Sequence, residues 1–339
     1  MGMRSRQQLR TATACLGIIA AAASLLAMAP AQAQRTGRAP AGGSPHVIMT
    51  IPVNREPTNI AVNPVTGMIY VTEPAQLQVI NGRTGKVTAT LHMPNRVFDV
   101  AVDPATDMIY ASDSSQRSVL AIDGKTSTVT AQIKLGGFGF WIATDPATDR
   151  IYTEAATSPG VEHVAVIDGR TNTLITRIPT HSIFVEGIAV NPVTNMIYAA
   201  AGSTNSLLVI SGQTNKVTAT VDTSPFYVAT DPVTNTIYAT ELGENSGLVD
   251  VINGQTNTLS TVIPGGSLEG IATDPSTDFV YTADFFGDNV RVINGQTSKV
   301  TAKVGVGHNP RGVAADPRAN RIYVANTGSR SVSVLAGAG

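Results

Sequence analysis

The chain has 339 residues, of which 42% are hydrophobic and only 14% are charged. This length is sufficient for a large apolar core, and the scarcity of Glu, Lys and Arg disfavours a mainly helical protein and favours β-structure with many turns. The net charge of −1 and the lack of a basic run argue against nucleic-acid binding by charge.

The first 33 residues have the features of a secretory signal peptide. Residues 1–10 contain three arginines and no acid, an apolar run fills residues 15–29, and the small-residue site Ala31-Gln32-Ala33 follows. A membrane anchor is the alternative, but the apolar run is shorter than a membrane-spanning helix usually needs. We therefore expect cleavage after Ala33, a periplasmic or secreted protein, and no membrane span in the mature chain.

Removal of this segment changes the charge and the cysteine count. It takes three of 23 basic residues and none of 24 acidic ones, which leaves 20 basic against 24 acidic residues and a net charge of −4. It also removes Cys15, the only cysteine, so the mature chain has no disulfide, thiol nucleophile or cysteine metal ligand. Residues 34–45, QRTGRAPAGGSP, are expected to form a flexible leader. Residues 46–339 are expected to form a single domain.

This domain contains a sequence repeat. An Asn-Pro or Asp-Pro pair occurs seven times, and six residues after each proline stands the tyrosine of an Ile-Tyr or Val-Tyr pair. The seven prolines are Pro64, Pro104, Pro146, Pro192, Pro232, Pro275 and Pro317. Their spacings of 40, 42, 46, 40, 43 and 42 residues match four short strands with their turns, the size of one β-propeller blade.

Each copy divides into four short strands, which we name A to D in chain order. In the first copy they are NIAV (59–62), MIYVT (68–72), QLQVI (76–80) and KVTAT (86–90). The Asx-Pro pair marks the A–B turn, and Asn81-Gly82 or a related pair marks the C–D turn, where Asn and Gly tolerate a positive φ. The sequence therefore predicts an all-β, seven-bladed propeller of four-stranded antiparallel blades.

The seventh copy lacks its last strand, because the chain ends in LAGAG after Val334. The segment HVIMTI at residues 46–51 precedes the first copy and resembles a D strand. We expect it to complete the last blade and so to close the ring, which protects the sheet edges.

Strand B ends in Tyr70-Val71-Thr72-Glu73, and in YASD, YATE, YTAD or YVAN in other copies. Together with the Asx-Pro-x-Thr and Ile-Asn-Gly-x-Thr turns, these phrases resemble the YVTN-type β-propeller repeat over about residues 46–335. The resemblance implies a seven-bladed ring similar to exported, YncE-like bacterial propellers. It does not imply one activity, since related propellers include lactonases and lyases.

The two faces of such a ring differ in how closely the seven sequence copies resemble one another. The A–B and C–D turns repeat almost unchanged, whereas the D–A and B–C loops on the opposite face vary in length and chemistry. Seven of eight Phe and the only Trp fall on this loop-rich face, and aromatic patches there favour a contact site. The alternative is that these rings plug the channel mouth and pack on neighbouring blades.

Three sets of candidate residues lie in these loops. The binding candidates are Phe98, Phe140, Trp141, Glu186, Phe226, Tyr227, Glu269 and Arg311. The catalytic candidates are Glu186, Glu269, His308 and Arg311. The metal candidates follow strand B and are Glu73, Asp113, Glu241 and Asp284, whose carboxylates would suit Ca²⁺ or another divalent cation at the channel mouth. Each of these carboxylates could instead cap its own loop.

We expect an exported, non-catalytic, monomeric propeller that binds a small molecule or an exported or cell-envelope protein at its loop-rich face, without a cofactor. Concave, partly apolar sites with a few convergent polar groups are typical of ligand binding. The alternative is a lactonase- or lyase-type enzyme with a polar site, and a bound divalent cation, at the channel mouth. No HExxH, GxSxG or P-loop motif is present to decide the matter.

Overall fold

The computed structural model describes residues 43–93, 96–157, 162–242 and 247–339. The predicted signal peptide (1–33) and residues 34–42 of the predicted leader lie outside the described residues. Within the described part of the chain, no helix has the length and apolar character needed to cross a membrane.

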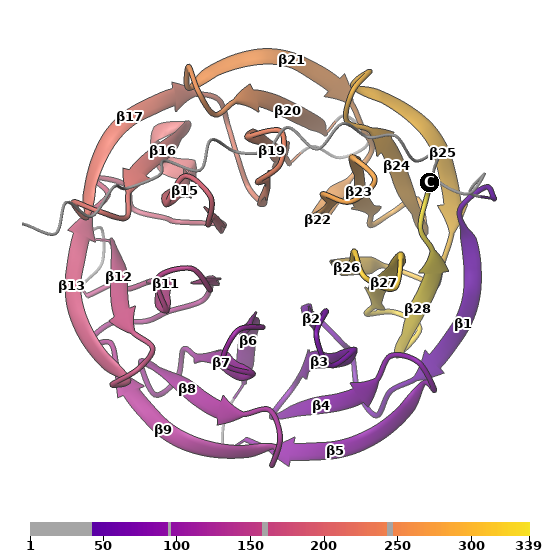
Figure 1. Ribbon diagram of the computed structural model, residues 1–339, viewed down its shortest axis with the longest axis horizontal. Helices are drawn as coiled ribbons and strands as arrows, with labels where there is room; N and C mark the ends of the chain where they lie inside the picture. The colour runs from indigo at the N-terminus through magenta and orange to yellow at the C-terminus, as the bar shows by residue number, and fades with distance from the viewer. Residues whose placement is uncertain (1–42, 94–95, 158–161, 243–246) are drawn as a thin grey trace, which may run out of the picture. The chain divides into compact units, whose positions relative to one another are not determined.

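Seven four-stranded antiparallel sheets surround one axis (Figure 1), which confirms the predicted propeller. Blade 1 contains β2 (Ile60–Asn63), β3 (Met68–Glu73), β4 (Gln76–Asn81) and β5 (Lys86–His92). Blade 2 contains β6 (Val97–Asp103), β7 (Met108–Asp113), β8 (Ser118–Asp123) and β9 (Thr128–Lys134). Blade 3 contains β10 (Ile142–Asp145), β11 (Arg150–Glu154), β12 (His163–Asp168) and β13 (Thr173–Pro179).

The remaining blades follow the same order. Blade 4 contains β14 (Ile188–Asn191), β15 (Met196–Ala201), β16 (Ser206–Ser211) and β17 (Lys216–Asp222), with the short 3-10 turn η1 (Gly202–Thr204) between β15 and β16. Blade 5 contains β18 (Val228–Asp231), β19 (Thr236–Glu241), β20 (Leu248–Asn253) and β21 (Thr258–Pro264). Blade 6 contains β22 (Leu268–Asp274), β23 (Phe279–Asp284), β24 (Asn289–Asn294) and β25 (Lys299–Gly305). Blade 7 contains β26 (Pro310–Asp316), β27 (Arg321–Asn326), β28 (Ser331–Ala336) and β1 (His46–Pro52).

The ring closes through the N-terminal strand, as predicted. Strand β1 pairs antiparallel with β28, with Thr50 opposite Ser333 and Ile51 opposite Val332. In Figure 1, β1 lies at the rim beside β28, where β5, β9 and the other D strands lie in their own blades. The two ends of the described chain therefore share one blade.

The repeated tyrosines form the core between blades. All seven have exposed fractions of 1% or less. Tyr70 of β3 belongs to the same apolar cluster as Val100 and Ile109 of the next blade, so each sheet is covered by its neighbour. Because both faces of the inner strands are buried, these strands read as nearly continuous apolar runs.

The repeated turns are held by their first side chain. Asp103 accepts hydrogen bonds from the backbone N–H groups two and three residues further on, at 2.8 and 3.4 Å, and Asp123 does the same at 2.9 and 2.8 Å. This is an Asx turn, and it explains why both turn types begin with Asn or Asp in most copies.

The predicted role of the Asn-Gly glycine is wrong in one respect. The positive φ of the C–D turn lies three residues after the glycine, at Gly85 (φ 68°) and Ser127 (φ 52°). The glycine is needed for close approach instead: Gly124 N donates to Asp107 O at 2.9 Å, and a Cβ at Gly124 would lie 2.5 Å from that oxygen. The C–D turn thus packs directly on the A–B turn.

Candidate functional site at the loop-rich mouth

The candidate binding residues stand where the inner strands begin. In β6 the pairing register shifts between Val97 and Val100, and β22 and β26 shift at the corresponding steps. Such a bulge frees a strand from its ladder and re-aims its side chains. It places Phe98, Glu269 and Arg311 at the loop-rich end of the channel.

Five aromatic rings form one connected cluster across blades 2, 3 and 5. Ring centroids lie 5.1 Å apart for Phe98–Phe140 and Phe98–Trp141, 4.8 Å for Trp141–Tyr227, 6.1 Å for Trp141–Phe226 and 5.0 Å for Phe226–Tyr227. All the pairs are edge-to-face, the favourable arrangement for aromatic rings. Trp141 is buried at the centre, while the other four rings are half-buried and keep surface toward the mouth.

A chain of polar groups continues from this cluster across blades 5, 6 and 7. The Tyr227 hydroxyl donates to Glu269 Oε2 at 3.0 Å, and Arg311 Nη2 lies 3.7 Å from Glu269 Oε1. The Arg311 guanidinium also lies over the Phe285 ring, 5.3 Å from its centroid. Burial, with a further contribution from the Glu269 carboxylate, raises the pKa of Tyr227 well above its usual value, so its hydroxyl stays protonated.

Arg311 has donors to spare. Its Nε atom is buried and has no hydrogen-bond partner among the described residues, and its contact with Glu269 is an ion pair longer than a hydrogen bond. An unsatisfied buried N–H is costly, so a water molecule or a ligand is expected to accept from it.

A small polar cavity of about 110 Å³ lies in the channel next to the aromatic cluster. Its wall includes Asn59, Asp99, Trp141 and Tyr227. Asp99 accepts from Val100 N at 2.9 Å through Oδ1 and from Ile142 N at 3.1 Å through Oδ2.

Asp99 is the one acidic group that the described part of the chain contributes to the wall of this cavity. Although it is partly open to the channel, it is surrounded by protein, and burial raises its pKa to about 7. A carboxyl group with this pKa can both give and take a proton near neutral pH.

Sequence reasoning missed Asp99, although a signal for it was present. It stands one position after the row of candidates that contains Phe98. At this position the copies read Asn59, Asp99, Trp141, Gly187, Tyr227, Gly270 and Gly312. Such different residues at one aligned position distinguish it from the invariant scaffold positions.

Two of these glycines allow neighbouring blades to meet at the mouth. A Cβ at Gly187 would lie 2.4 Å from the backbone oxygen of Phe226, and a Cβ at Gly270 would lie 2.4 Å from that of Arg311. Any side chain at these positions would push apart the strands that carry the site.

The four catalytic candidates do not form one group. Only Glu269 and Arg311 are neighbours. His308 Nδ1 instead pairs with Asp288 Oδ2 at 2.7 Å, with 76% of the histidine side chain exposed. No hydrogen bond or ion pair joins His308 or Glu186 to Glu269 or Arg311 among the described residues.

Two of the metal candidates cap the D–A loops that lead into their blades from the preceding blade. Glu73 Oε2 accepts from Arg55 N at 3.0 Å and also contacts Gln76 Nε2. Glu241 Oε1 accepts from Ser224 N at 3.0 Å.

The other two metal candidates have equally local partners. Asp113 Oδ1 accepts from Gln116 N at 3.1 Å, and Asp284 Oδ2 binds Arg291 Nη2 at 2.8 Å. Among the residues that the structure describes, no group of three or more His, Cys, Asp or Glu is arranged to hold a metal ion. A Ca²⁺ site at the mouth remains a prediction.

A buried carboxyl pair between blades 3 and 4 was also missed. Glu154 and Glu162 are 3% and 6% exposed, and one oxygen of each lacks a hydrogen-bond partner within the described chain. Burial, and then the charge of Glu162, raises the pKa of Glu154 well above its usual range, and burial also raises that of Glu162. Glu186 is electrostatically coupled to both. The sequence signal for this pair was Glu154, which stands where other copies have Thr72, Ser112 or Ala200.

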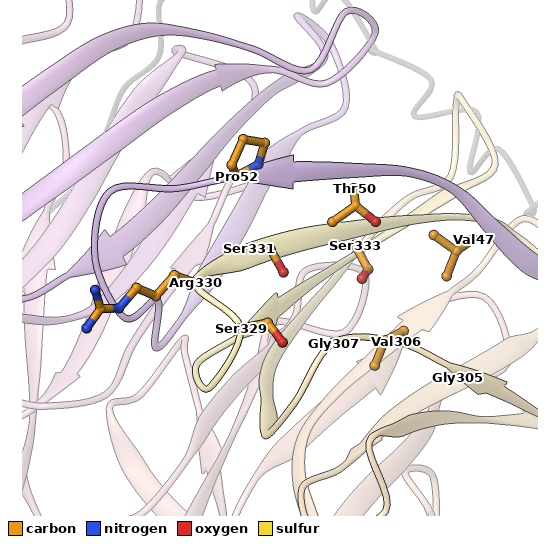
Figure 2. Close-up of a pocket in the computed structure, with 10 residues that line it drawn as sticks. All are labelled: Val47, Thr50, Pro52, Gly305, Val306, Gly307, Ser329, Arg330, Ser331 and Ser333. Atoms are coloured by element: carbon orange, nitrogen blue, oxygen red, sulfur yellow. The ribbon is translucent and has the colours of Figure 1, made fainter.

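Two larger hollows are less suited to specific binding. Figure 2 shows a groove of about 520 Å³ at the closing seam, between the end of β25 and strands β28 and β1. It exists because short side chains such as Ser333 stand where other copies have Gln78 or Leu208. The charged residue in its described lining, Arg330, extends to the side and pairs with Glu56 at 3.1 Å. A hollow of about 630 Å³ on the turn-rich face is lined by repeated turn residues.

Comparison with known proteins supports the fold and nothing finer. No known family and no curated protein matches the sequence. The fold matches 1652 chains of solved structures, among them a chain of Kuenenia stuttgartiensis hydrazine synthase. That chain is 17% identical, with a TM-score of 0.72, and the match covers 82% of this chain and 95% of the other. At this identity the likeness shows a shared β-propeller fold alone.

Proposed function

We propose that the protein is an exported, non-catalytic propeller of the YVTN type that binds a small ligand or a protein partner at its loop-rich mouth. The observation that carries this proposal is the connected cluster of five aromatic rings around Trp141, flanked by the Tyr227–Glu269–Arg311 chain. Apolar walls with a few fixed polar groups are typical of ligand sites.

The distribution of variation supports the same function. Equivalent positions that hold the ring together are alike in all seven blades, such as the buried tyrosines. Equivalent positions at the mouth differ in size, polarity and charge, as Thr58, Phe98, Glu186 and Arg311 do. A plain channel plug would need apolar bulk alone, whereas this mouth combines aromatic rings with a polar chain that has unused donors.

The test uses Trp141, the only tryptophan, as a fluorescent reporter inside the cluster. Wild-type protein would be screened against panels of organic acids, amines, amino acids and sugars, and against detergent-solubilised cell-envelope proteins. The Phe98→Ala, Phe140→Ala and Phe226→Ala variants should lose the binding that wild type shows. They should still unfold cooperatively, because the three rings are half-buried and lie outside the blade cores.

Phe286→Ala is the matched control, since Phe286 is 60% exposed on the same face and its ring contact is with Phe285 rather than with the cluster. This variant should bind like wild type. Undiminished binding by a folded variant with all three cluster phenylalanines replaced would refute the proposed site.

One observation favours an enzyme of lactonase or lyase type as the second candidate. Asp99, with a pKa of about 7, lies in the channel cavity whose wall also contains Tyr227. A hydrolase and lyase screen with and without a chelator tests this function. Turnover that is lost in Asp99→Asn and kept in His308→Gln would establish catalysis at the cavity, and no turnover would leave the binding function.

A further inference from the structure

The geometry points to a small carboxylate with an aromatic or apolar body as the ligand of the mouth. This inference rests on the proposed binding function and specifies the chemical class that the site would take. Some polar groups at the mouth already have hydrogen-bond partners, and others have none.

Two of the three acids near the mouth have partners, whereas the Glu186 side chain has no hydrogen bond or ion pair among the described residues. Both carboxylate oxygens of Asp99 accept backbone N–H groups. Glu269 uses one oxygen for the Tyr227 hydroxyl and presents the other to Arg311. An organic cation at Asp99 or Glu269 would therefore compete with contacts that already exist.

The donors, in contrast, are free. Arg311 has a buried Nε–H without an acceptor, and its guanidinium makes no hydrogen bond among the described residues. Trp141, whose indole N–H can only donate, lies in the wall of the neighbouring cavity. Free donors require a ligand with acceptor oxygens, and a guanidinium matches the two oxygens of a carboxylate.

The position of Arg311 is fixed before a ligand arrives. Phe285 lies under its guanidinium, and Glu269 holds it from one side while being held itself by Tyr227. A guanidinium that lies over an aromatic ring can still donate in-plane hydrogen bonds from its edge. This preorganisation lowers the entropy that binding would otherwise cost.

The cavity whose wall includes Gly312, the residue after Arg311, limits the body of the ligand. The cavity of about 110 Å³ has Trp141 and Tyr227 in its wall, and their rings offer apolar surface to a ligand. This volume is smaller than the roughly 150 Å³ of an apolar cavity that holds benzene, and much of the wall is polar, so the cavity admits a short chain or the edge of one ring. The nearby acids oppose an anion only weakly, because burial raises the pKa values of Asp99 and Glu186 and Glu269 is paired with Arg311.

The experiment compares three probes of nearly equal shape: 3-phenylpropionate, its amide and 3-phenylpropylamine. Binding to the full mature chain would be followed by Trp141 fluorescence and by calorimetry. The carboxylate should bind at least about tenfold more tightly than the amide, because a charged hydrogen-bond pair contributes roughly 1.5–3 kcal/mol. The amine should bind more weakly than both.

Variants assign the effect to Arg311. Arg311→Met should reduce the affinity for the carboxylate by about tenfold or more and leave that for the amide nearly unchanged. Arg311→Lys should restore part of the loss, since it keeps the charge without the planar fork. Arg330→Met is the matched control, because Arg330 is an exposed arginine whose ion pair with Glu56 lies outside the aromatic cluster.

Three results would overturn the inference: tighter binding of the amine than of the carboxylate, equal affinities of wild type and Arg311→Met, or no binding of any probe. The first two would leave the proposed binding function intact with a different ligand class. The third would also leave it intact if the wider screen still finds a ligand that requires Phe98 and Phe226. Failure of the screen as well would refute both.

Discussion

The turn-rich and loop-rich faces of the ring are made by the same seven repeats, yet they have opposite properties. On the turn-rich face each blade repeats one arrangement, in which the C–D turn donates a hydrogen bond to the A–B turn, as from Gly124 N to Asp107 O. On the loop-rich face residues at equivalent positions contact each other across blades, as Trp141 and Tyr227 do. The first arrangement stabilises the ring, and the second creates one asymmetric cluster of side chains at its axis.

The largest effect is expected in the shared core. Tyr110→Ala should lower the free energy of unfolding by about 3–5 kcal/mol, because the ring is fully buried between blades and its removal leaves a cavity. Urea denaturation would measure this loss. On the loop-rich face Phe286→Ala should change the same quantity by less than about 0.5 kcal/mol. Similar losses in both variants would break the division into scaffold and site.

Gly270→Ala tests the point where scaffold and site meet. Its Cβ would lie 2.4 Å from the Arg311 backbone oxygen, so the strands must separate, with an expected loss of about 1–3 kcal/mol in unfolding free energy. Ligand binding at the mouth should weaken with it. Gly305→Ala is the control, because a Cβ at Gly305 would meet no described atom within 4 Å and stability should hardly change. An unaffected Gly270→Ala variant would show that the blades do not need this close approach.

The Glu154–Glu162 pair should make stability depend on pH. Because burial raises both pKa values, the folded protein binds more protons than the unfolded chain, and this contribution is complete below the ordinary glutamate pKa. Stability should therefore fall as the pH rises from about 4.3 toward the raised values.

Glu154→Gln should reduce this slope above neutral pH and be the more stable protein there, by on the order of 1 kcal/mol. Asp99 and Asp250, whose pKa values burial raises to about 7 and about 6, should keep a slope at lower pH. Thermal unfolding between about pH 5 and pH 9 would measure it, with the exposed Glu56→Gln as control. A Glu154→Gln profile with the same slope as wild type above neutral pH would mean that burial does not raise the pKa of Glu154.

The smallest effect is expected on the exposed turns. Val193→Thr should change the free energy of unfolding by less than about 0.5 kcal/mol, because Val193 is 74% exposed. Val190→Thr, three residues earlier but buried, should cost at least about 1 kcal/mol, because it places a hydroxyl in the core. Denaturation curves of the two variants would compare them directly, and a large loss in Val193→Thr would reveal a contact on this face.

The architecture could be read from the sequence because its signals are local and repeated. Each Asx side chain bonds to the backbone only two or three residues away, and the period of the tyrosines reports one blade at a time. Even the shared blade was predictable, since a copy that lacks its last strand requires a strand from elsewhere. The role of the turn glycine could not be predicted, because the close approach of Gly124 to Asp107 brings together two turns of one blade.

The candidate site could not be predicted in the same way, because its residues come from different blades. Tyr227 lies 42 residues before Glu269, and Glu269 lies 42 residues before Arg311; they meet only because the ring brings the starts of the inner strands of neighbouring blades together. Asp99 and Glu154 look like ordinary acids in the sequence, and their raised pKa values come from burial by other blades. The sequence by itself determined the blades and the face that varies, since those follow from local turn chemistry and periodicity. Only the tertiary structure decided which varied residues share a site, because their contacts are made between blades.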